Sequence, residues 1–140
     1  MFFNLQSVVM AMLAAVLVSN VSQARKIPLD IQEKWKKVVE PYHQTCINET
    51  HIDPDAVISM LTDSRLPSER SIHCYWKCIL EHLKFLVDGE FNIDLMNNQV
   101  YLITPEVSKP CIQIAFGEKE VCKRIYTFVQ CGMNAAINSI

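Results

Sequence analysis

The sequence predicts one all-helical domain of about six short helices held together by disulfide bonds, and three observations predict it. Apolar residues recur at helical spacing in four separate segments. The chain has only 3 Gly, which is poor for a β-rich sandwich or a phosphate-binding loop. Six Cys in 140 residues is an even count in a short chain and is typical of a disulfide framework. A chain of this length is expected to form a single domain.

Residues 1–24 have the pattern of a secretory signal peptide. Val8–Val18 is an unbroken run of eleven apolar residues, and Ser22 and Ala24 are small residues before the expected cleavage after Ala24. A transmembrane anchor is the alternative, but eleven helical residues rise only about 16 Å against a hydrocarbon core of about 30 Å. We therefore expect a domain of residues 25–140 that is secreted and has no stable membrane insertion.

The first two helices of that domain are predicted from spacing and capping residues. Asp30–Thr45 is amphipathic, with a bend expected at Pro41. The second helix is predicted to begin with Asp53 as N-cap and Pro54 at the first helical position. The expected inward-facing residues of the two helices are Ile31, Trp35, Val38, Val39, Tyr42, Val57, Ile58 and Leu61.

A third helix is predicted to begin at Pro67-Ser68 and to end at the turn Asp88-Gly89. The segment Phe91–Ile103 fits either a short helix or an extended piece. The inward face of the third helix is expected to hold Ile72, Tyr75, Trp76, Ile79, Leu83 and Leu86.

Two more helices are predicted near the C-terminus. Thr104-Pro105-Glu106 has the pattern of a capped helix start, although Pro110 is expected to disturb the first turns. The last helix is predicted over Glu118–Cys131, and Gly132–Ile140 is then a short tail. The inward residues of the predicted last helix are expected to be Val121, Ile125, Phe128 and Val129.

The six cysteines are separated by 27, 3, 32, 10 and 8 residues. Cys74 and Cys78 are one helical turn apart, so a bond between them would have poor geometry and each is expected to join another element. Excluding that pair leaves 12 of the 15 possible pairings. Metal binding by Cys74 and Cys78 with His73 and His82 is the alternative, but thiols of exported proteins are normally oxidised. We therefore expect no metal and no cofactor. The cysteines are Cys46, Cys74, Cys78, Cys111, Cys122 and Cys131.

This spacing resembles the six-cysteine type of the insect odorant-binding and pheromone-binding protein family. The family's fixed gaps of 3 and 8 residues are both present, and Gly89-Glu90-Phe91-Asn92 is a further local similarity. The resemblance covers the whole of residues 25–140. It implies the pairing Cys46–Cys78, Cys74–Cys122 and Cys111–Cys131, and helices packed around an apolar cavity.

The resemblance also implies a function. Family members carry small hydrophobic molecules (odorants, pheromones or lipid-like semiochemicals) in an internal pocket and solubilise them in sensillar lymph or another body fluid. Each CH₂ group of the ligand that is buried contributes about 0.8 kcal/mol of binding free energy. An apolar pocket is therefore sufficient for such binding, and no catalytic group is needed. Tyr75, Tyr101, Tyr126 and Thr127 are candidates for a polar contact to the ligand. Expected pocket residues, each of which could equally be ordinary core, are Trp35, Val38, Leu80, Leu83, Phe91, Leu95, Ile114, Ile125, Phe128 and Val129.

Other function classes fit less well. A net charge of -2 gives no electrostatic case for nucleic acid. His73-Cys74 and His82-Leu83 lack the Asp of a phospholipase A2 site, so no enzyme is predicted. The main alternative is a secreted helical interaction protein, such as a hormone-like, salivary or venom factor that acts on a receptor. Candidate protein partners of a carrier are an olfactory receptor and a second copy in a weak homodimer.

Three further features carry hypotheses. Asn48-Glu49-Thr50 is an N-glycosylation sequon. The tail is either a frayed terminus or a lid that places Ile137 and Ile140 over the pocket opening. The histidines could release ligand when protonated, or could be surface groups without that role. They are His43, His51, His73 and His82.

Overall fold

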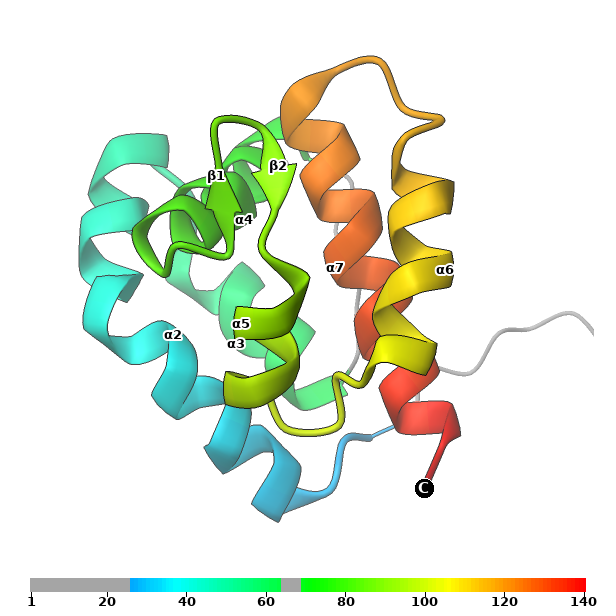
Figure 1. The fold of residues 1–140 in the computed structure, drawn as a ribbon. Coiled ribbons are helices and arrows are strands. Elements are labelled where there is room, and N and C mark those ends of the chain that lie inside the picture. Colours follow the sequence, from blue (N-terminus) through cyan, green and yellow to red (C-terminus); the bar gives the residue numbers. More distant parts are fainter. Residues whose placement is uncertain (1–25, 64–68) are drawn as a thin grey trace, which may run out of the picture.

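The computed structural model describes residues 26–63 and 69–140, which fold into six helices and one short hairpin (Figure 1). The six helices confirm the predicted all-helical class. The predicted signal peptide and the predicted helix start at Pro67-Ser68 lie outside the described residues. The elements are α2 (Leu29–Thr50), α3 (Pro54–Asp63), α4 (Arg70–His82), β1 (Leu86–Val87), β2 (Glu90–Phe91), α5 (Ile93–Gln99), α6 (Pro105–Ala115) and α7 (Val121–Asn138).

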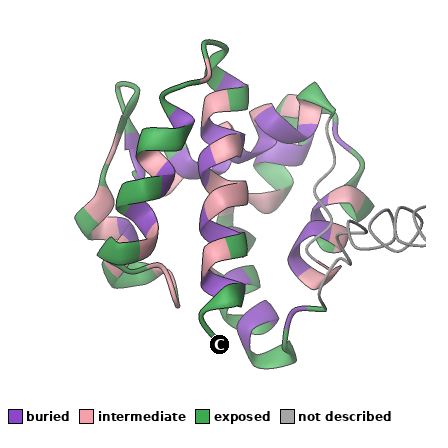
Figure 2. Ribbon diagram, turned by 90° about the vertical axis from the view of Figure 1, so that its right-hand side faces the viewer, coloured by how far each residue is buried: buried purple, intermediate pink, exposed green. Residues whose placement is uncertain are grey.

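Helix α4 is the centre of the packing. It packs against α7 on one side and α2 on the other, while α3 packs on α2 and α6 on α7. Figure 1 shows α2 and the α6–α7 pair on opposite sides of the molecule, with the hairpin at one end. The buried residues of α7 recur about every three or four positions and so share one face, and Figure 2 shows buried bands alternating with less buried ones along the helix that ends at the C-terminus. None of the described helices is both long enough and apolar enough to cross a membrane.

Helix α3 begins at Pro54, as the capping residues predict, and α2 begins at Leu29, one residue before the predicted Asp30. Helix α2 continues through Pro41 and ends beyond the predicted Thr45, where His51 takes a left-handed conformation with φ 54°. The carboxylate of Asp53 accepts a 2.9 Å hydrogen bond from the backbone N–H of Asp55, which occupies a free donor in the first turn of α3.

Helix α4 ends earlier than the sequence predicts. It stops at His82, and Lys84 then reverses the chain with φ 62°. Leu86 consequently lies in strand β1 and not on the helix face. Asp88 and Gly89 have φ values of 51° and 81°, the left-handed pair that a two-residue hairpin turn requires.

The C-terminal third departs most from prediction. Phe91–Ile103 resolves into β2, the short helix α5 and a connecting segment, and α6 runs past Pro110 without interruption. Helix α7 continues to Asn138, so the predicted tail Gly132–Ile140 is wrong. The helix continues because Met133, Ala136 and Ile137 extend its apolar spacing and are buried.

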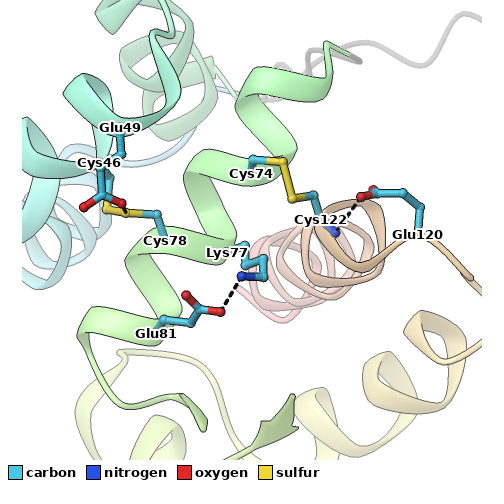
Figure 3. Close-up of polar contacts among 8 residues, drawn as sticks. All are labelled: Cys46, Glu49, Cys74, Lys77, Cys78, Glu81, Glu120 and Cys122. Carbon is cyan, nitrogen blue, oxygen red and sulfur yellow. Dashed lines mark hydrogen bonds and ion pairs between the residues drawn. A yellow bond between two sulfur atoms is a disulfide. The ribbon is translucent and has the colours of Figure 1, made fainter. Parts of the chain in front are cut away.

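Three disulfide bonds fix these helices, in the pairing that the resemblance implies. Cys46–Cys78 joins α2 to α4, Cys74–Cys122 joins α4 to α7, and Cys111–Cys131 joins α6 to α7. Figure 3 shows the first two bridges leaving α4 toward different neighbours. The central helix is thus covalently tied to both of its main packing partners.

Candidate ligand cavity

A cavity lies between α2, α4 and α7. Its volume, counted as the space that the centre of a water-sized sphere can occupy, is about 90 Å³. On the same measure one water molecule needs roughly 10–15 Å³, so the cavity is several times larger than that. Further wall residues come from α3, α5, α6 and the segments between helices. The seventeen lining residues are Trp35, Val38, Val39, Leu61, Trp76, Ile79, Leu80, Leu83, Phe85, Met96, Val100, Ile103, Ser108, Phe128, Val129, Gly132 and Met133.

The three main helices supply the wall through helical spacing. Side chains three and four residues apart share a face. In this way α2 presents Trp35 with Val38 and Val39, and α4 presents Trp76 with Ile79, Leu80 and Leu83. Helix α7 contributes Phe128, Val129, Gly132 and Met133 at the same spacing.

The structure brings six of the ten expected pocket residues to this cavity: Trp35, Val38, Leu80, Leu83, Phe128 and Val129. It does not place the other four there. Ile114 is 58% exposed near the end of α6, and Ile125 is only 1% exposed but packs in the core. Phe91 lies against Phe128, with ring centroids 4.5 Å apart, and Leu95 is partly buried beside the core.

Polar groups are few at this wall. The indole Nε1 of Trp35 donates a 2.9 Å hydrogen bond to the carbonyl oxygen of Tyr101, and the Lys34 ammonium lies 3.6 Å from the centre of the Tyr101 ring. None of the four residues expected to offer a polar contact lines the cavity. Tyr75, for example, shares a 2.8 Å hydrogen bond with His43, and burial raises the pKa of its hydroxyl.

Residues 29–135 match the PBP/GOBP family model. The chain belongs to this family. Among solved structures it is similar to Apis mellifera odorant binding protein 5, with 23% sequence identity and a TM-score of 0.55 over 79% of this chain and 93% of that one. Among curated proteins, none matches the chain. The resemblance carried by the cysteine spacing is therefore confirmed. PBP/GOBP family members are carriers of small ligands and not enzymes.

Eleven lining residues were not among the expected pocket residues. Met96 and Ser108 lie on α5 and α6 and were not predicted to face inward, whereas four others were expected to face inward only as core: Val39, Leu61, Trp76 and Ile79. Phe85, Val100 and Ile103 lie outside the helices, where periodicity gives no inward direction. Gly132 and Met133 belong to the part of α7 beyond Cys131, where the sequence predicts a tail. Extending the apolar spacing of the last helix to Ile137 would have found them.

The histidines lie away from the cavity in this member of the PBP/GOBP family. His73 is stacked on Tyr126, with centroids 4.3 Å apart, and burial lowers its pKa below 6.5. His82 stacks on Tyr42 and its Nε2 lies 3.7 Å from a Glu49 carboxylate oxygen. The metal alternative fails for Cys74 and Cys78, because both thiols are consumed by disulfides.

Asn48, the expected glycosylation site, lies in the last turns of α2 and is exposed. Its side-chain oxygen accepts a 3.0 Å hydrogen bond from Gln44 Nε2. The side chain thus faces solvent on a regular helix, and glycosylation stays a prediction.

Proposed function

We propose that this protein is a secreted carrier that binds one small hydrophobic molecule in the cavity between α2, α4 and α7. The observation that carries the proposal is the cavity itself, which is walled by aliphatic and aromatic side chains in a PBP/GOBP family member. Odorants, pheromones and lipid-like semiochemicals have the size and polarity such a wall accepts. The carrier would solubilise them in sensillar lymph or another extracellular fluid.

The energetics are adequate for a carrier. Eight buried methylene groups contribute about 6 kcal/mol at 0.8 kcal/mol each, and micromolar binding needs about 8 kcal/mol. Aromatic contacts from Trp35, Trp76 and Phe128 can supply the remainder. Because disulfides hold α4 to α2 and α7, the wall is formed before the ligand arrives, which lowers the entropic cost of binding.

Secretion rests on the predicted signal peptide, residues 1–24, together with the three disulfides. An olfactory receptor and a weak homodimer stay predictions from the sequence, since the described residues carry no feature specific to either.

The test is a titration of the fully oxidised mature protein with N-phenyl-1-naphthylamine, followed by competition with alcohols, esters and aldehydes of increasing chain length. A carrier gives saturable one-to-one binding and micromolar displacement. Val129→Phe, which fills the cavity, should abolish probe binding, whereas Ile114→Phe on the exposed side of α6 should not. A native protein that binds no probe would favour the interaction-protein alternative.

A further inference from the structure

Both indole N–H groups beside the cavity already have partners within the protein. Trp35 Nε1 donates to the carbonyl oxygen of Tyr101 at 2.9 Å, and Trp76 Nε1 lies 3.0 Å from the sulfur of Met60. Both residues line the cavity and are only 5% exposed to solvent, and because each N–H is paired within the protein, the ring carbons are what the indole offers to a ligand. The two tryptophans therefore act as apolar surface.

Ser108 is the third wall residue with a polar side-chain atom, and its hydroxyl is also occupied. Its Oγ lies 3.0 Å from the carbonyl oxygen of Thr104, one turn earlier in the chain, and 3.2 Å from Asn97 Oδ1. The residue is fully buried. Of the described residues at the wall, none is Lys, Arg, His, Asp or Glu.

We propose that the cavity selects molecules without a hydroxyl or an ionised group, and discriminates against the alcohol and the carboxylate of the same carbon skeleton. This inference rests on the proposed carrier function and narrows its ligand class to hydrocarbons, halogenated hydrocarbons and simple esters. The selection comes from a wall whose polar side-chain atoms are already paired within the protein, so that a ligand hydroxyl or carboxylate finds no free side-chain partner among the described lining residues.

The physical reason is the loss of hydration. A hydroxyl group that enters the cavity leaves its water partners and meets ring faces and methyl groups, so it goes unpaired. A carboxylate loses far more, because an isolated charge is strongly disfavoured in an apolar environment. A hydrocarbon of equal length has neither cost. An ester gives up water only at its carbonyl oxygen, has no donor to leave unpaired and carries no charge, so its cost is smaller than that of the alcohol or the carboxylate. Shape and dispersion then set the affinity.

The chain provides its own reporter for this test. It has 2 Trp, and both line the cavity. A bromine atom in contact with an indole ring quenches its fluorescence, so brominated ligands report entry directly. We would titrate the fully oxidised mature protein at about pH 8 with four ligands: 1-bromooctane, methyl 8-bromooctanoate, 8-bromo-1-octanol and 8-bromooctanoate. The last of these is ionised at that pH.

The expected result is a clear order of affinity. 1-Bromooctane should quench at the lowest concentration and the methyl ester at a somewhat higher one. The alcohol should bind at least about tenfold more weakly than the ester, and the carboxylate at least about a hundredfold more weakly. Quenching by the alcohol or the carboxylate within threefold of the ester would overturn the selectivity and leave the carrier function standing. Quenching by none of the four would remove the carrier function itself, and the selectivity with it.

A variant of Leu83 makes the test independent of ligand solubility. Leu83 lines the cavity but is only partly buried, at the C-terminal end of α4. In Leu83→Lys the ammonium can stay near solvent while pairing with a carboxylate at the cavity edge. Relative to the wild type, the variant should raise the affinity for 8-bromooctanoate over that for 1-bromooctane at least about tenfold, because both ligands lose the leucine contacts and only the carboxylate gains a charge partner. Leu83→Met is the matched apolar control and should keep the wild-type order. No gain in the lysine variant would show that missing charge pairing is not what excludes the carboxylate.

Discussion

Trp35 on α2 donates a 2.9 Å hydrogen bond to the carbonyl oxygen of Tyr101, in the segment between α5 and α6. The two residues are 66 positions apart in the chain. Trp35, Val100 and Ile103 all line the cavity, so this bond joins two parts of its wall. The wall thus depends on a long-range contact as well as on the packing of α2, α4 and α7.

Replacement of Trp35 by Phe should lower stability measurably. The change removes the donor to Tyr101 and part of the ring, and we expect the free energy of unfolding to fall by about 1–3 kcal/mol. Chemical denaturation measures this. Trp76→Phe is the matched control, since Trp76 is equally buried and its N–H meets only the weak acceptor sulfur of Met60. An equal or larger loss in the control would show that the Tyr101 bond has no special role.

Gly132 in α7 should set the depth of the cavity. A Cβ at this position would lie 3.6 Å from Ile103 Cδ1, an ordinary contact. Gly132→Ala should therefore raise stability by about 0.5–1 kcal/mol through helix propensity. It should also shift the preferred ligand to a shorter chain, because the methyl group occupies cavity space.

Gly117→Ala is the control for that variant. Its Cβ would lie only 3.2 Å from the carbonyl oxygen of Ile114, and the position is not at the cavity. No stability gain is expected and no change in chain-length preference. If Gly132→Ala left the chain-length series unchanged in a competition assay, this part of α7 would not contact the ligand.

The protein should lose stability below about pH 6.5. Burial lowers the pKa of His73 in the folded state, partly opposed by Glu120, so the unfolded state binds the proton more readily. The contribution of His73 is thus fully present above 6.5, the unfolded value, and is lost as the pH falls toward the folded value. Unfolding free energies measured from pH 8 to 5 should decline less steeply in His73→Gln. Identical slopes in both proteins would assign the acid sensitivity to other groups.

The disulfides should rank by loop length. Cys74–Cys122 spans 48 residues and Cys111–Cys131 spans 20, for which the chain-entropy relation gives about 4 and 3 kcal/mol. Paired Cys→Ser variants should follow that order in denaturant unfolding. A larger loss for the Cys111/Cys131 pair would mean that local packing between α6 and α7 outweighs loop entropy.

The helices and six of the seventeen residues of the cavity wall were predicted from the sequence, because periodicity defines an inward face. Trp35 and Leu80 show this, since each lies on a regular helix and faces the cavity. Periodicity fails for Ile125, which faces inward but packs in the core beside the cavity. It is silent for Phe85, whose position is set by the chain reversal at Lys84.

The end of α7 shows a different limit. The predicted helix ends at Cys131, yet tertiary burial of Met133 and Ile137 outweighs the propensity cost of Gly132 and the helix continues. The disulfide pairing, in contrast, could not be chosen from the residues alone and came from family resemblance. Local patterns thus predicted the elements, while the shape of the cavity depends on contacts between residues far apart in the sequence.

The most direct test of the account is a crystal structure of the oxidised protein soaked with 1-bromooctane, in which anomalous scattering locates the bromine. The account predicts one bromine site inside the cavity, in van der Waals contact with Trp35, Trp76 or Phe128. A bromine site only on the outer surface, beside exposed residues such as Ile114 and Phe116, would contradict it.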